Sequence, residues 1–205
     1  MEIKEFKIRC SAIGQIMTNP RSKSETLSKT CMSYCEQWLK EQLYGVQKHI
    51  ESKYLSKGIE VEALALDYYS EAKGLGFVLQ NTEFFEDDFL NGTPDLILPD
   101  YVVDMKASWD CFTFPLFEKD VDKKYWMQLQ GYMHLTGKRK AKLVYTLQNT
   151  PDELEWDEPT DYEGLDEDLR IKEFEFEYDA EFIENLQERV ILCREYIENL
   201  KKQIT

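Results

Sequence analysis

The stretch "NGTPDLILPDYVVDMKAS", residues 91–108, decides the fold class of this chain. Two short runs rich in β-branched and aromatic residues, 93–99 and 101–107, meet at a Pro-Asp pair, which predicts two strands joined by a tight turn. Asp95 lies in the first run and Asp104 in the second. Lys106 follows two residues later, so in a strand it lies on the same face as Asp104. Apolar neighbours surround these charges, which argues against a solvated face.

This hairpin predicts a candidate metal site. A hairpin of this size can bring the carboxylates of Asp95 and Asp104 near one point, and Mg²⁺ prefers such hard oxygen ligands. The Lys106 ammonium could then hold or deprotonate an attacking water, while the metal neutralises charge that builds on a phosphate. The competing interpretation is an ordinary exposed ion pair, because a D-x-K pattern is short and common.

A preceding helical segment can deliver a third carboxylate. The run GIEVEALALDYYSEAKG, residues 58–74, has an apolar stripe that includes Ala65 and ends at Gly74, as an amphipathic helix does. Glu62 lies in its first turn. Glu60 competes for the same role from a different helix face. The alternative for either residue is a glutamate placed at a helix start for the macrodipole.

The rest of the chain predicts an α/β fold: a mixed central sheet flanked by helices, with a helical N-terminal segment and a C-terminal helix. One domain spans 1–205, with a helical part at 1–57, a catalytic core at 58–150, an acidic loop at 151–170, and a strand and helix at 171–205. Periodicity predicts further helices at 11–18, 24–45, 122–137 and 181–203, and further strands at 77–85, 140–148 and 171–179.

Composition narrows the classes of function. The apolar share of 42% supports a packed core. Five scattered cysteines without a CxxC pair favour reduced thiols over a disulfide framework or a zinc ribbon. We find no run long enough for a membrane span and no signal-peptide core, so we expect a cytoplasmic protein without a membrane partner.

The net charge of −15 at first argues against a nucleic-acid partner. However, residues 151–168 contain ten acids and no Lys or Arg, which leaves only −5 for the rest of the chain. A basic groove elsewhere is therefore compatible with the composition. We expect the acidic stretch to be a surface loop that repulsion keeps away from DNA.

Five motifs in order resemble the PD-(D/E)xK nuclease superfamily, in its phage lambda-type alkaline exonuclease or YqaJ-type viral recombinase branch. The segment IRCSAIGQIMTNPRSK, residues 8–23, is similar to the opening of that branch. The other four motifs are G-x-x-x-E-x-x-A-x-x-x-Y at Gly58, Glu62, Ala65 and Tyr69; P-D at Pro94 and Asp95; D-x-K at Asp104 and Lys106; and Q-x-x-x-Y at Gln128 and Tyr132.

The resemblance implies a restriction-endonuclease-like core and a specific activity. That activity is Mg²⁺-dependent hydrolysis of duplex DNA from the 5′ end, with Mn²⁺ as a substitute metal, which leaves a 3′ single strand for phage recombination. It also implies a homotrimeric ring around DNA ends, a single-strand annealing protein as partner, and a phage or prophage origin in a bacterial host cytosol. An iron–sulfur centre is not expected, because the late cysteine cluster of such variants is absent.

The resemblance also assigns roles by position. Asp95, Asp104, the Met105 carbonyl and Glu62 would hold the metal, and Lys106 would activate the water. Gln128 and Tyr132 would lie beside the catalytic face, and Ser11 would contact the terminal phosphate. The arginine that binds the 5′ phosphate has no certain match; Lys4, Lys7 and Arg9 are candidates. Arg21 is a further candidate for contact with the DNA backbone.

Two alternatives stay open. The same nuclease chemistry could act on nicked, branched or single-stranded DNA. A protein of another class, an acidic interaction protein that mimics the charge of DNA, could keep the fold without catalysis. Dependence on a divalent metal and the effect of Asp104→Asn distinguish catalysis from mimicry.

Overall fold

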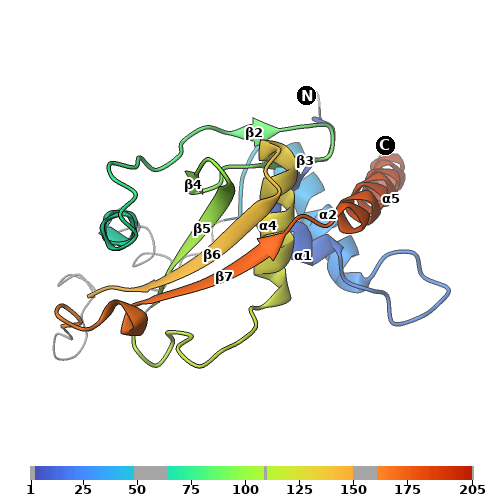
Figure 1. Cartoon of the computed structure of the whole chain (residues 1–205). Helices are drawn as coiled ribbons and strands as arrows, with labels where there is room; N and C mark the ends of the chain where they lie inside the picture. The colour runs from blue at the N-terminus through green and yellow to red at the C-terminus, as the bar shows by residue number, and fades with distance from the viewer. Residues whose placement is uncertain (1–2, 49–63, 109, 150–160, 205) are drawn as a thin grey trace.

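The computed structural model describes residues 3–48, 64–108, 110–149 and 161–204. Its centre is a four-stranded sheet of β4 (Leu96–Ile97), β5 (Tyr101–Ser108), β6 (Lys140–Leu147) and β7 (Ile171–Glu177), in that spatial order. β5 and β6 run parallel, and the two outer pairings are antiparallel. Figure 1 shows this sheet beside helix α4 (Lys123–Thr136). The predicted mixed α/β fold is confirmed.

The two faces of this sheet bury different side chains because residues alternate along a strand. Val102 of β5 and Leu143 of β6 belong to the larger core, with residues from the helices α1 (Ile13–Ile16), α2 (Lys29–Tyr44), α4 and α5 (Ala180–Ile204). Val103 and Met105 belong to a second core on the other face. Asp104 therefore shares the face of Val102, toward α4.

A smaller sheet lies at one end of α4. β3 (Leu90–Gly92) pairs in parallel with β1 (Ile8–Arg9) and antiparallel with β2 (Phe85–Glu86). The short helix η1 (Cys10–Ala12) follows β1 directly and packs on α4. This arrangement carries the N-terminal segment to the side of α4 on which the motif residues of β5 lie.

The opposite face of the central sheet is covered by a helix at 64–72, which is the described part of the helix predicted at 58–74. Tyr69 is buried there, and its hydroxyl donates a hydrogen bond to Glu173 of β7 at 2.6 Å. Gly74 closes the helix with a φ of 62°, as predicted. Positions 58–63, including Glu60 and Glu62, lie outside the described residues.

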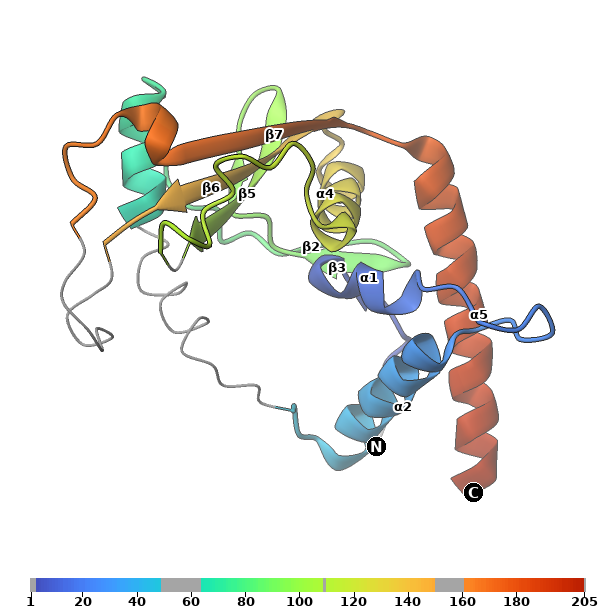
Figure 2. The same cartoon turned by 90° about the horizontal axis from the view of Figure 1, so that it is seen from below.

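Helices α2 and α5 come from opposite ends of the chain and pack against each other. Figures 1 and 2 show them side by side, on the side of α4 away from the tip of the central sheet. The loop between α1 and α2 projects outward on that same side in both views. In the part of the chain with described coordinates, no helix combines the length and apolarity of a bilayer span.

Three sequence predictions on secondary structure were wrong in detail. The strand predicted at 77–85 is reduced to β2, because Phe77 and Leu79 are exposed and no strand in the described part of the chain pairs with them. The helix predicted from Ser24 begins at Lys29, because Ser28 is the residue whose hydroxyl accepts the Cys31 amide. The strand predicted at 93–99 is only β4. The predicted strands at 101–107, 140–148 and 171–179 and the helices at 122–137 and 181–203 are confirmed within two residues.

Candidate active site

Asp104 and Lys106 of β5 form an ion pair on the α4 face of the sheet. The Asp104 side chain is 2% exposed, and its Oδ2 lies 2.5 Å from the Lys106 Nζ. This oxygen makes no hydrogen bond of regular geometry, so the contact is best described as an ion pair. The predicted common face of the two residues is confirmed, and the expectation of an ordinary exposed pair does not fit a buried carboxylate.

Helix α4 supplies the next contact. Gln128 donates from Nε2 to the other oxygen of Asp104, Oδ1, at 2.8 Å, and lies 3.0 Å from the Tyr132 hydroxyl. Both residues are buried one helical turn apart, so they face the same strand. The Q-x-x-x-Y motif is therefore in direct contact with the D-x-K motif.

Asp95 reaches the site from the turn before β4. Its Oδ2 accepts the backbone amide of Met105 at 2.7 Å. The Met105 carbonyl in turn accepts a hydrogen bond from Lys106 Nζ at 3.3 Å. The Asp95 side chain is thus held against the backbone of β5, next to Lys106.

The electrostatics of the pair follow from burial. Burial raises the pKa of the Asp104 carboxyl, although the positive charge of Lys106 opposes this. Burial alone would lower the pKa of Lys106, but the charge and close contact of Asp104 together with the charge of Asp95 outweigh it, so the pKa of Lys106 is raised. Lys106 is therefore held as an ammonium, a form suited to orienting water and balancing charge rather than to accepting a proton.

The oxygen ligands fit a divalent cation. A buried carboxylate oxygen without a regular hydrogen bond carries a desolvation cost that a cation would offset. Asp95 and Asp104 offer hard carboxylate oxygens, which Mg²⁺ and Mn²⁺ prefer over nitrogen or sulfur. The third predicted carboxylate, that of Glu62, falls outside the described residues.

A polar groove of about 870 Å³ lies between the N-terminal segment and helix α2. It is lined by Lys4, Lys7, Arg9, Ser11 and Asn91, among others. Cys10, between the two predicted DNA-contact residues Arg9 and Ser11, is buried against α4 at Gly131, one turn after Gln128. The groove therefore borders the N-terminal segment that packs on α4. It collects the three basic residues that the sequence left as alternatives, of which Lys7 is paired with Glu86 at 3.2 Å.

Arg21 is not part of this arrangement. It lies in the exposed loop between α1 and α2, which projects away from the central sheet (Figure 2). The prediction of a DNA-backbone contact at Arg21 therefore lacks support from the position of its loop.

Sequence reasoning missed one aromatic neighbour of the site. Lys106 Nζ lies 5.4 Å from the centroid of the Tyr125 ring, which makes an edge contact with Tyr145 of β6. Cation–π attraction of this kind restricts an ammonium group. The available signal was the position of Tyr125 three residues before Gln128, on the same face of α4.

Comparison with solved structures identifies the class of protein. No protein-family model and no curated protein matches the chain. A phage-related exonuclease from Haemophilus somnus 129PT matches with a TM-score of 0.87 and 29% identity, over 98% of each chain. An alkaline exonuclease from Laribacter hongkongensis matches with a TM-score of 0.71 and 18% identity, over 97% of this chain and 93% of its own; its complex with dAMP matches equally well.

The fold is similar to that of a phage-related exonuclease, and with the contact between the D-x-K and Q-x-x-x-Y motifs it supports the PD-(D/E)xK nuclease superfamily. Within that superfamily, the similarity to the phage-related exonuclease supports the branch of the phage lambda-type alkaline exonucleases, or YqaJ-type viral recombinases.

Proposed function

We propose that this chain is a metal-dependent deoxyribonuclease that hydrolyses duplex DNA from the 5′ end and leaves 3′ single strands for phage recombination. The observation that carries the proposal is the buried carboxylate of Asp104, held between the Lys106 ammonium and the Gln128 amide. The names of the two similar exonucleases support the same activity. An acidic protein that only mimics DNA would have no use for a desolvated carboxylate at this position.

Each residue of the site has a chemical task. Asp95 and Asp104 would hold Mg²⁺, with the Met105 carbonyl and Glu62 as further oxygen ligands. When bound, the metal would neutralise charge at the scissile phosphate and lower the pKa of a bound water. Gln128 fixes the carboxylate plane of Asp104 through Oδ1. Lys106, as an ammonium, orients the attacking water and balances negative charge that develops on the phosphate oxygens.

The groove supports the 5′-end preference. Arg9, Ser11 and Lys4 are exposed in the groove, while Lys7 is paired with Glu86. Such groups bind phosphate oxygens through charge-assisted hydrogen bonds. The groove is therefore the proposed binding site of the terminal 5′ phosphate.

The decisive experiment is digestion of linear duplex DNA labelled separately at each end, with Mg²⁺, Mn²⁺ or a chelator. We expect metal-dependent release of the 5′ label by the wild type, and a loss of at least about a thousandfold in Lys106→Ala and Asp104→Asn. Lys202→Ala, which changes an exposed lysine in the last turn of α5, is the matched control and should keep full activity. No cleavage with any metal by a folded wild type would refute the proposal.

The 5′ preference is tested separately with duplexes that carry a 5′ phosphate or a 5′ hydroxyl. The wild type should degrade the phosphorylated duplex faster, and Arg9→Ala should bring the two rates together. If the wild type degrades both duplexes at the same rate, the proposed 5′-phosphate preference is wrong. Nicked, branched or single-stranded DNA would then be the substrates to test.

The resemblance also suggests a trimeric ring and an annealing partner. Phe112 and Phe117, in the segment that follows β5, are 92% and 88% exposed, which is unusual for large apolar side chains on a monomer. We therefore propose that this segment contacts a second copy of the chain. Sedimentation of the wild type, compared with Phe112→Ser and Phe117→Ser, tests this assembly.

A further inference from the structure

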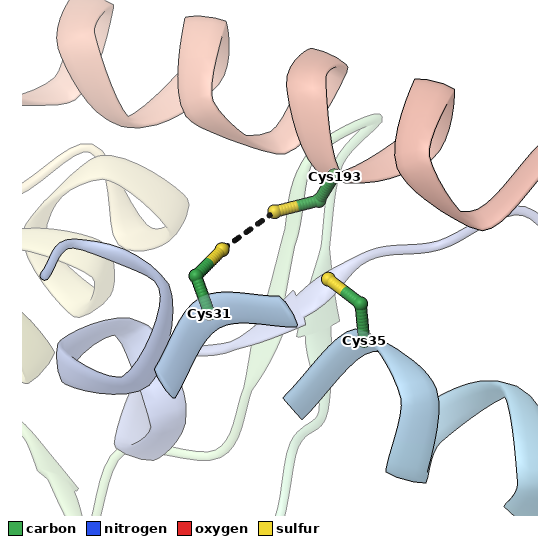
Figure 3. Close-up of side chains that lie close together, drawn as sticks. All are labelled: Cys31, Cys35 and Cys193. Carbon is green, nitrogen blue, oxygen red and sulfur yellow. Dashed lines mark hydrogen bonds between the residues drawn. The ribbon is translucent and has the colours of Figure 1, made fainter. Parts of the chain in front are cut away.

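Three buried cysteines meet between α2 and α5, far from the carboxylate site. Cys31 and Cys35 lie one turn apart on α2, and Cys193 faces them from α5 (Figure 3). All three side chains are fully buried, and their Sγ atoms lie within 4.8 Å of one another. The Sγ atoms of Cys31 and Cys193 are 3.4 Å apart. We call this group the thiol cluster.

The spacing of the sulfurs matches a metal site. Three sulfurs bonded at about 2.3 Å to one central ion lie about 4 Å apart when the ion is in their plane. The observed separations, from 3.4 Å to at most 4.8 Å, bracket that value. No His, Asp or Glu of the described residues joins the group. Sulfur-only ligands select soft metals and disfavour Mg²⁺ and Ca²⁺.

We propose that the thiol cluster binds one thiophilic metal ion through three thiolates and so ties α2 to α5. Zn²⁺ and Cu⁺ both have this ligand preference. Zn²⁺ usually takes four ligands, whereas the cluster supplies three in a fully buried position, which favours Cu⁺. Each bound thiol gives its proton to solvent, so the site loads more strongly as pH rises.

A disulfide explains the arrangement of the three cysteines less completely than a metal ion does. Side chains four residues apart on a helix have Cβ atoms about 5–6 Å apart, whereas a disulfide needs about 3.8 Å. Cys31 and Cys35 therefore cannot pair while α2 stays helical. A bridge from Cys193 to either one leaves a third buried thiol without a role, whereas a metal ion engages all three.

A nearby positive charge partly offsets the burial that disfavours thiolates at this position. Arg189 lies one turn before Cys193 on α5, and its charge acts on both Cys31 and Cys193. It is held in place by the backbone carbonyls of Thr18 and Thr26. Its charge reduces the net negative charge that a metal with three thiolates would otherwise leave buried.

The test is metal binding by the reduced full-length chain, measured without DNA. Cu⁺ is titrated anaerobically against a chromogenic Cu⁺ chelator, and Zn²⁺ in a separate arm against a zinc chelator. We expect one ion per chain, a sulfur-only coordination shell by X-ray absorption, and a higher melting temperature of the loaded protein. The arm with the tighter affinity identifies the metal.

Variants separate ligation from packing. Cys35→Ala and Cys193→Ala should each lose more than about tenfold in affinity. Cys111→Ala removes an exposed thiol outside the cluster and should bind as the wild type does. Val190→Ala loosens α5 one turn before Cys193 without removing a sulfur, and should keep most of the affinity.

The proposal is overturned if the folded wild type binds neither ion, or if the cysteine variants bind as tightly as the wild type. It is also overturned if Val190→Ala loses as much affinity as they do. The absorption spectrum of the wild type decides the matter even if a cysteine variant fails to fold, because oxygen or nitrogen ligands would place the ion elsewhere. None of these results depends on nuclease activity.

Discussion

At the scale of single residues, the site is built around one carboxylate whose burial lowers the stability of the folded state. Asp104 is 2% exposed, and burial raises its pKa, so the ionised form is disfavoured without a cation. Lys106 at Oδ2 and Gln128 at Oδ1 offset part of the desolvation cost of this carboxylate. Such a buried charge is retained when it has a chemical task, which is why we place the metal there.

Replacement of Gln128 by Ala is expected to lower nuclease activity by about tenfold or more, because Asp104 Oδ1 loses its hydrogen bond and the carboxylate its orientation. The metal concentration for half-maximal activity should rise in parallel. A titration of Mg²⁺ at saturating DNA measures both effects.

The matched control is Gln130→Ala, two residues along the same helix. Gln130 is also buried, but it donates to the Glu177 carbonyl and accepts from the Asp179 amide, away from the site. Its loss should cost stability, about 1–3 kcal/mol, and leave the metal requirement unchanged. If both variants shift the metal requirement equally, Gln128 has only a structural role.

At the scale of elements, α4 reaches the site because two glycines let it approach closely. A Cβ at Gly131 would lie 2.7 Å from Cys10 Sγ and 2.8 Å from the Ile13 side chain, and a Cβ at Gly92 would lie 2.8 Å from the Tyr132 ring. Helix α4 therefore packs on η1 and β3 at a distance that a side chain would not allow. This close packing positions Gln128 against β5.

Gly131→Ala is therefore expected to destabilise the protein by about 1–3 kcal/mol through overpacking, in spite of the better helix propensity of Ala. In Gly14→Ala the new Cβ meets its nearest atom at 3.4 Å, an ordinary contact, so that helix variant should be neutral or slightly stabilised. Urea denaturation of both variants measures the difference. Equal stability of the two would show that the α4 contact is loosely packed.

The strand β7 is joined to its neighbours by Glu173, and this contact predicts a pH dependence. Burial acts against ionisation, but hydrogen bonds from Tyr69 and Lys142 and the charges of Lys142 and Lys73 lower the pKa of Glu173 overall. A lowered folded-state pKa adds stability above the unfolded value of about 4.3. That stability is lost as pH falls through the folded-state pKa.

Glu173→Gln should therefore cost about 1–2 kcal/mol at pH 7, and the difference from the wild type should shrink below about pH 4. Glu175→Gln is the control, because Glu175 also pairs with Lys142 but is 58% exposed, so its loss should have little effect. Denaturation at pH 7 and at low pH compares the three proteins. If the stability difference between Glu173→Gln and the wild type grows toward low pH, the lowered pKa of Glu173 is contradicted.

At the scale of the whole molecule, the unusual feature is charge. The chain carries −15 overall, and ten of its acids lie in residues 151–168, yet the proposed substrate is a polyanion. Local binding by Lys4, Lys7 and Arg9 must therefore act against a repulsive long-range field. This repulsion acts mainly on the rate of association, because salt screens it over a Debye length of about 10 Å at 0.1 M.

Replacement of the ten acids of 151–168 by their amides should speed association with duplex DNA by about tenfold at low ionic strength. The difference should disappear near 1 M salt, where the Debye length is about 3 Å. Stopped-flow fluorescence with labelled duplex measures these rates. Slower association of the amide variant would show that the acidic stretch assists DNA binding instead.

Local sequence patterns predicted much of this protein, because they depend on neighbours in the chain. Alternation and turn residues located β5, β6 and β7, and Gly137 marked the end of α4. The spacing of Asp104 and Lys106 placed both on one face of a strand. The same reasoning failed at 77–85, where apolar residues resemble a strand but find no partner, and at Ser24, where Ser28 offered the better cap.

The sequence by itself determined the strand and helix content, the hairpin with its acids and lysine, and the likeness to a nuclease superfamily. Only the tertiary structure decided which distant segments meet. It placed Gln128 against Asp104, gathered Lys4, Lys7 and Arg9 in one groove, and brought Cys193 to Cys31 across 162 residues of chain. Such contacts depend on how the helices pack on the sheets, and glycine positions and buried side-chain shapes set that packing over the whole molecule.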